Sequence, residues 1–161
     1  MIWAILGSME MMLEISAHLS TIELEEYTIK TYQRLERLTR EDGVYTVLNV
    51  RFEPASSGFP DGDYCFSDGS TYHFLRIERG TIIVDKVTGD LFEIVYWVLA
   101  ANVQYMSFLY EQRHRIQGQD NRIQMFSQRL RYYSELGEDF LEKGEDEIRE
   151  ILKIAPYQDL H

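Results

Sequence analysis

Cysteine, proline and basic residues are scarce in this 161-residue chain. Its single cysteine, Cys65, excludes an intramolecular disulfide and favours a reducing compartment, so we expect a cytoplasmic protein. The longest uninterrupted apolar run, Ile94 to Ala101, is too short to cross a bilayer. No Lys or Arg precedes Lys30, so the N-terminus lacks the positive region of a secretory signal peptide.

Basic residues are few, and this limits the kinds of ligand that the chain is expected to bind. Sixteen basic residues stand against 27 acidic ones, which gives a net charge of −11 and a pI near 4.8. Nucleic-acid binders usually carry a basic surface that neutralises phosphates, and anionic membranes attract basic segments. The composition therefore argues against both ligands and favours a basic protein partner, which the opposite charge would attract.

Catalytic and metal-binding signatures are also missing. The chain contains none of the motifs GxGxxG, GxxxxGK[ST], HExxH, GxSxG or CxxC. Asp61, Asp63 and Asp68 resemble the start of a calcium loop, but Cys65 stands at the third ligand position. Cys65 and His73 could form a nucleophile and base, yet a lone cysteine in a strand is usually a small buried hydrophobe. We therefore expect no metal, no cofactor and no enzymatic activity.

The chain length favours one domain over residues 1–161. Residues 1–19 form a possible irregular or extended start. The true start codon is one of four methionines close together: Met1, Met9, Met11 and Met12.

The pattern of elements indicates an α+β fold. A capping box at Ser20 and Glu23 begins a helix predicted over 20–41. Alternating and turn-bounded segments then predict an antiparallel four-stranded meander, followed by three C-terminal helices packed on one face of the sheet. The predicted strands span 44–53, 63–66, 71–78 and 81–87, and the predicted helices span 91–117, 119–136 and 138–153.

The helix predicted over 91–117 is apolar almost all round as far as Tyr110. Such a helix is buried by its neighbours, so we expect Trp97 and Leu99 to be largely buried at the centre of the molecule.

Two charged regions are candidate surfaces. Arg113, Arg115 and Arg122 could together bind an anion, but pairing with Glu111 and Asp120 is the favoured interpretation. From Glu135 to Glu150 there are eight acidic and two basic residues, a net charge of −6. This region is either a solvated helix face or a docking surface for a cationic partner. The predicted partner-binding residues are Glu138, Asp139, Glu142, Glu145 and Asp146, with Asp61, Asp63 and Asp68 as a second set.

The order and spacing of short motifs in the second half of the chain resemble the immunity protein 63 family of bacterial polymorphic-toxin systems. The resemblance covers roughly residues 44–159 and is strongest over 72–126. Its motifs are Tyr72-His73, Glu78-Arg79-Gly80, Asp90-Leu91, Tyr96-Trp97, Tyr110-Glu111, His114-Arg115-Ile116, Gln119-Asp120, Arg122, Phe126, Glu150-Ile151-Leu152-Lys153 and Pro156-Tyr157.

The resemblance implies a cytoplasmic protein that binds and neutralises a toxin domain, with no catalytic residues to carry over. Two alternatives remain: a small enzyme that acts on an anionic substrate through the Arg113–Arg122 cluster, and an adaptor or oligomerisation subunit unrelated to toxins. The sequence sets neither the chemistry of the toxin, nor the stoichiometry of its complex.

Overall fold

The computed structural model describes residues 18–158, so most of the expected irregular start and all four candidate start codons lie outside the described residues. The described elements follow the order α2 (Thr21–Gln33), α3 (Glu36–Glu41), β1 (Gly62–Ser67), β2 (Tyr72–Glu78), β3 (Thr81–Thr88), α4 (Leu91–Arg113), α5 (Asn121–Leu136) and α6 (Glu138–Ile154). The α+β class is confirmed. Among these elements no helix is long and apolar enough to span a membrane.

The long N-terminal helix predicted over 20–41 is two helices. The Ser20–Glu23 capping box is present at the start of α2, and both of its reciprocal hydrogen bonds form. At Arg34 and Leu35 the backbone N–H groups bond three residues back, to Thr31 and Tyr32, instead of four. This tighter turn ends α2 and redirects the chain. No glycine or proline marks the break, so the sequence pattern did not reveal it.

The sheet has three antiparallel strands in the order β1–β2–β3, not four. Cys65 pairs with Phe74 across the first hairpin, and Leu75 pairs with Asp85 across the second. Arg79 and Gly80 both adopt positive φ angles in the two-residue turn between β2 and β3, as tight hairpins of primed type require.

The strand predicted over 44–53 is wrong: this segment makes only an isolated bridge, from Arg51 to Tyr64. Side chains from two helices hydrogen-bond to its backbone carbonyls instead. The Tyr32 hydroxyl donates to the Thr46 carbonyl at 2.5 Å, and the Asn102 amide donates to the Val47 carbonyl at 3.0 Å. The apolar alternation therefore predicted correctly which side of this segment is the more buried one. It did not predict whether the segment pairs in the sheet, because helix side chains compete for the same backbone groups.

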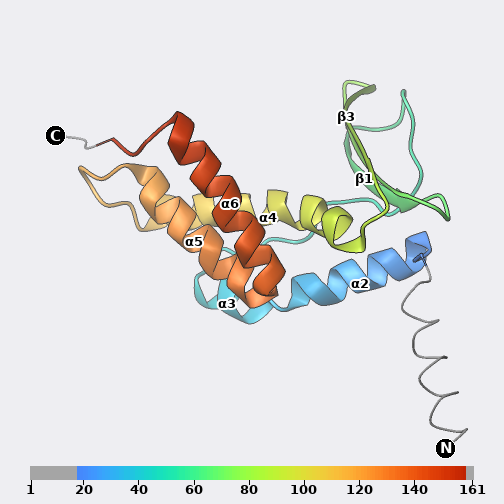
Figure 1. Cartoon of the computed structure of the whole chain (residues 1–161). Coiled ribbons are helices and arrows are strands. Elements are labelled where there is room, and N and C mark those ends of the chain that lie inside the picture. Colours follow the sequence, from blue (N-terminus) through green and yellow to red (C-terminus); the bar gives the residue numbers. More distant parts are fainter. Residues whose placement is uncertain (1–17, 159–161) are drawn as a thin grey trace, which may run out of the picture.

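Helix α4 runs through the middle of the molecule, with the sheet at one end and α5 and α6 toward the other (Figure 1). The Asp90 carboxylate begins it by accepting from the Phe92 amide at 2.7 Å. The core gathers around α4: Leu99 is fully buried, as expected, whereas Trp97 is only partly buried. Side chains from α2, the sheet, α5 and α6 all join this one cluster.

The three C-terminal helices are not all packed on the sheet, as had been expected. Of these three helices, α4 is the one that packs closely on β2 and β3, whereas α5 packs mainly on α4 and α6 mainly on α5. The physical reason is the apolar circumference of α4, which needs covering on the side away from the sheet as well. Figure 1 shows α5 and α6 crossing this side as a second layer.

Leu99 tests whether α4 is the structural centre. Replacing Leu99 by alanine should lower the free energy of unfolding by about 2–5 kcal/mol, because the deletion leaves a cavity in a packed core. Chemical denaturation measures the change. Ile154→Ala is the control, since this side chain is 88% exposed. A loss for Leu99→Ala as small as that of the control would show that α4 is peripheral.

Gly144 tests the contact between α5 and α6. A Cβ atom at this position would lie 2.3 Å from Cδ2 of Tyr133, which is itself fully buried. Gly144→Ala should therefore destabilise the protein by about 1–3 kcal/mol through overpacking, despite the roughly 1 kcal/mol that alanine gains in helix propensity. The matched control is Glu145→Ala, at the exposed neighbouring position. Thermal unfolding in which Gly144→Ala melted higher than wild type would refute this close packing.

Candidate functional site

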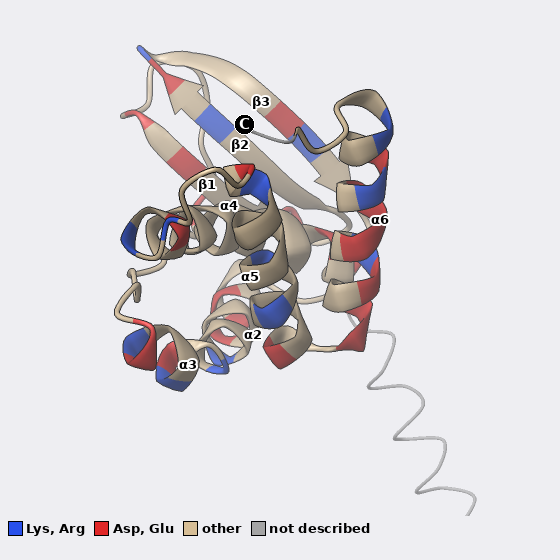
Figure 2. Cartoon of the chain, turned by 90° about the vertical axis from the view of Figure 1, so that its left-hand side faces the viewer, with Lys and Arg blue, Asp and Glu red and all other residues tan. Residues whose placement is uncertain are grey.

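The outer face of α6 carries a row of carboxylates. Glu138, Asp139, Glu142, Glu145 and Asp146 are all exposed, and Figure 2 shows acidic residues on successive turns of α6. Their spacing of three and four residues places them on one side of the helix. Asp146 pairs with Arg149 at 2.6 Å. The carboxylates of the other four form no hydrogen bond or ion pair within residues 18–158.

The inner side of α6 is fastened to the core. Phe140, Gly144 and Ile148 are buried, and two polar contacts tie the helix to α4. Lys143 donates to Glu93 at 2.6 Å, and the Tyr96 hydroxyl donates to Glu147 at 2.7 Å. Because the inner side is held this way, the carboxylate row sits on a rigid support, with no ion pair to α5 within the described chain.

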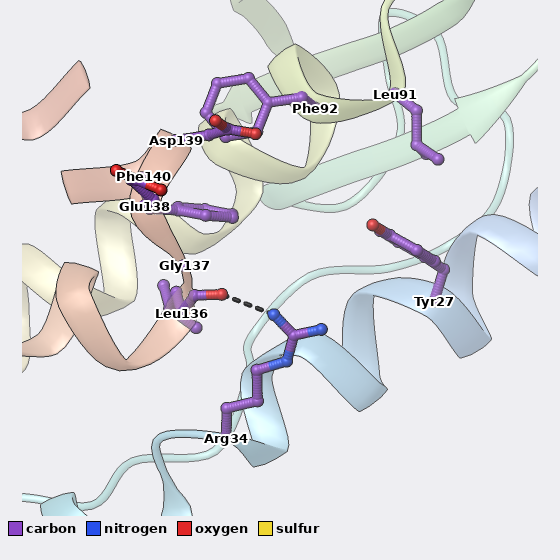
Figure 3. A pocket seen from close by; sticks show the side chains of 9 residues that line it. All are labelled: Tyr27, Arg34, Leu91, Phe92, Leu136, Gly137, Glu138, Asp139 and Phe140. Atoms are coloured by element: carbon purple, nitrogen blue, oxygen red, sulfur yellow. Dashed lines mark hydrogen bonds between the residues drawn. The ribbon is translucent and has the colours of Figure 1, made fainter. Parts of the chain in front are cut away.

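A hollow of about 520 Å³ lies at the N-terminal end of this row, between α2, α4 and α6 (Figure 3). Tyr27 and Phe140 approach it from opposite sides, and Glu138 and Asp139 border it. Arg34 donates to the Leu136 carbonyl at 2.6 Å and so satisfies the end of α5. Aromatic faces beside carboxylates suit a cationic side chain. No sequence pattern predicted this hollow, because α2 and α6 are more than a hundred residues apart in the chain.

The second predicted set of acidic residues is used inside the chain. Asp63 accepts two hydrogen bonds from Arg76, at 2.6 and 2.9 Å. Asp61 accepts from the Gly80 amide at 3.2 Å. Asp68 accepts from the backbone of the first hairpin turn and from His73, which holds the pKa of its carboxyl well below the usual range. Each of these three carboxylates thus has a structural partner.

The arginine cluster is also committed to internal partners, as the favoured interpretation expected. Arg115 forms two hydrogen bonds with the buried carboxylate of Glu111, at 2.9 and 3.0 Å. Arg122 pairs with Asp120 and donates to the carbonyls of Ala155 and Pro156, so it joins the start of α5 to the segment after α6. Arg113 donates to the Gly43 carbonyl. Each of the three arginine side chains therefore has a hydrogen-bond acceptor within the protein.

The pair of Cys65 and His73 does not assemble a nucleophile and base. Cys65 lies opposite Phe74 in the sheet and is fully buried, and burial raises the pKa of its thiol to about 12. His73 is stacked on Phe66 and bonded to Asp68. Within residues 18–158 no three His, Cys, Asp or Glu side chains come together in a group that could hold a metal ion.

Comparison with known protein families matches residues 68–150 to the family described as Immunity protein 63. The matched region runs from the first hairpin turn through most of α6, so it includes the carboxylate row. No curated protein and no solved structure matches the chain.

Arg122 tests whether the arginine cluster is structural. Arg122→Ala should lower the melting temperature by several degrees, because it leaves the nearly buried Asp120 carboxylate and two carbonyls without their donor. The control is Arg37→Ala, which removes an exposed pair with Glu41 and should have almost no effect. Equal melting temperatures for wild type and Arg122→Ala would indicate that this arginine is free to bind something else.

Proposed function

The chain belongs to the immunity protein 63 family, and from this we propose that it binds and neutralises a cognate toxin domain of a bacterial polymorphic-toxin system. The family match over just over half of the chain indicates a toxin-neutralising role. We propose further that the protein acts in the cytoplasm by direct contact, without catalysis, and that the toxin domain is basic.

The observation that supports a docking surface is the carboxylate row on α6. Like charges three and four residues apart on a helix repel one another by a few tenths of a kcal/mol per pair. Four of the five predicted residues have no compensating partner within the described chain, whereas the carboxylates of the first hairpin region are all engaged. A cationic partner would relieve the repulsion along α6. The docking surface therefore centres on α6, with Asp61, Asp63 and Asp68 as a secondary contact.

The hollow beside α6 supplies an anchor at one end of the surface. Tyr27, Phe92 and Phe140 line it, and Glu138 and Asp139 supply two negative charges, against the single positive charge of Arg34, which is bonded to the Leu136 carbonyl. A lysine or arginine of the toxin would be held by both kinds of contact. Buried anchors of this type carry most of the binding free energy in protein interfaces, whereas the surrounding exposed charges act mainly on the rate of encounter.

Reversing Glu142 and Glu145 to lysine tests this surface. Association with the cognate toxin should slow by tenfold or more at low ionic strength, because opposite charge accelerates encounter. The loss should shrink as salt screens the charges. Stopped-flow binding to the cognate toxin domain measures both effects.

The matched control reverses Glu53 and Glu78 to lysine. These two exposed glutamates lie on the sheet side of the molecule, so the control changes the net charge by the same amount away from α6. Both double variants should unfold like the wild type. If the two variants slowed association equally, net charge alone would be responsible; if neither did, the toxin would dock elsewhere.

A further inference from the structure

Arg129 of α5 is a buried arginine without a counter-ion. Its side chain belongs to a residue that is only 7% exposed, and its Nε–H has no hydrogen-bond partner among the described residues. No carboxylate within residues 18–158 forms an ion pair with it. Its guanidinium lies 5.1 Å from the centre of the Phe126 ring, which can stabilise the charge but does not accept the Nε proton along a normal hydrogen bond.

Arg129 borders a hollow of about 570 Å³ between α4, α5 and α6. The other charged side chains around this hollow already have partners. Lys143 pairs with Glu93, Asp146 pairs with Arg149, Glu150 pairs with Lys153, and Glu147 accepts from the Tyr96 hydroxyl. Arg129 is therefore the charged group of this hollow that the described chain leaves unsatisfied.

The Nε–H of Arg129 is out of contact with water and has no acceptor among the described residues, whereas a buried donor is ordinarily hydrogen-bonded. On this ground, and resting on the function proposed above, we infer that the α4–α5–α6 hollow receives a carboxylate side chain of the toxin, which pairs with Arg129. Gln104 of α4 also lines the hollow, and its amide can donate a further hydrogen bond. Ile151 supplies an apolar surface for the methylene groups of an aspartate or glutamate.

The surroundings favour a carboxylate over a phosphate. Asp146, Glu147 and Glu150 border the hollow, and each would repel an incoming anion. A dianionic phosphate feels about twice the repulsion of a singly charged carboxylate. The carboxylate also matches the planar fork of arginine, with which it forms two parallel hydrogen bonds. A nucleic-acid backbone is disfavoured because it brings one negative charge at every phosphodiester, and several of these would face the carboxylates of α6 at once.

This contact would set the register of the complex. The exposed carboxylates of α6 attract any basic surface and so distinguish poorly between partners. A single positive site behind them accepts only a partner whose surface places one carboxylate at that point, because like charge in a wrong register is strongly unfavourable. Arg129 thus adds specificity to a surface that otherwise selects on net charge.

The first test needs no toxin. The full chain, labelled with ¹⁵N, is titrated with N-acetylglutamate α-amide, which carries one carboxylate, and with the neutral N-acetylglutamine α-amide. The Arg129 Nε–H signal, assigned by its absence from Arg129→Lys, should shift and saturate with the first compound and stay fixed with the second. Equal shifts with both compounds, no shift with either, or a larger shift with inorganic phosphate would overturn the carboxylate site.

The second test uses the cognate toxin. Arg129→Met should raise the dissociation rate at least tenfold, and this loss should persist at high salt because the pair is buried. The control Arg37→Met removes an exposed arginine of α3, outside the proposed surface, and should leave dissociation unchanged. Replacing an unpaired buried charge by an apolar side chain should leave the unfolding midpoint of the free protein unchanged or raised, which separates binding from a structural role.

The outcomes separate this inference from the proposed function. Toxin that binds wild type and Arg129→Met with the same dissociation rate would overturn the carboxylate contact alone. A lowered unfolding midpoint in Arg129→Met, with normal dissociation, would assign the arginine a structural role and also overturn it. Wild-type protein that failed to bind the toxin at all would overturn the proposed function.

Discussion

Helix α4 is apolar around nearly its whole circumference, and the arrangement of the other elements follows from the need to cover it. The sheet covers its first turns through Tyr72 and Phe74, and α2 contributes Leu24 and Tyr32 from another side. The sheet and α2 each meet α4 with one face only, so neither could cover α4 alone. The layer formed by α5 and α6 covers a further side, while Tyr105 and Phe108 of α4 remain exposed. A sheet with all its helices on one face would have left this further side of α4 in water.

The position of α6 at the outside of this layer creates the candidate docking surface. Its inner side is set by Gly144, which allows Tyr133 of α5 to approach closely, and by the contacts of Lys143 and Glu147 to α4. The outer side packs against no other described element, and it is there that the acidic residues lie. The same packing that buries α4 therefore presents a rigid row of carboxylates to a partner.

The distribution of charge within the fold explains where the excess of acidic residues resides. Carboxylates at element junctions are matched by donors: Glu111 by Arg115, and Asp120 by Arg122. Asp42 accepts from Gln128, Arg131 and Tyr132, and so joins the end of α3 to α5. Because these arginines pair with carboxylates at the junctions, they do not neutralise the carboxylates of α6, which retains most of its negative charge. Arg129 is the exception, a positive charge behind the carboxylate row that has no ion-pair partner within residues 18–158.

Local signals determined a large part of this protein. The Ser20 and Asp90 caps, the two hairpins, the all-round apolarity of the 91–113 segment and the net charge were readable from neighbours in the chain, because capping, turn formation and periodicity act over a few residues. Tertiary packing decided the rest. Residues 44–53 do not pair in the sheet, because the side chains of Tyr32 and Asn102 hydrogen-bond to backbone carbonyls of this segment. Packing also divided the first helix at Arg34 and Leu35. It also left Arg129 buried without a carboxylate, because which charges meet depends on how α4, α5 and α6 approach one another, and no local pattern encodes that approach.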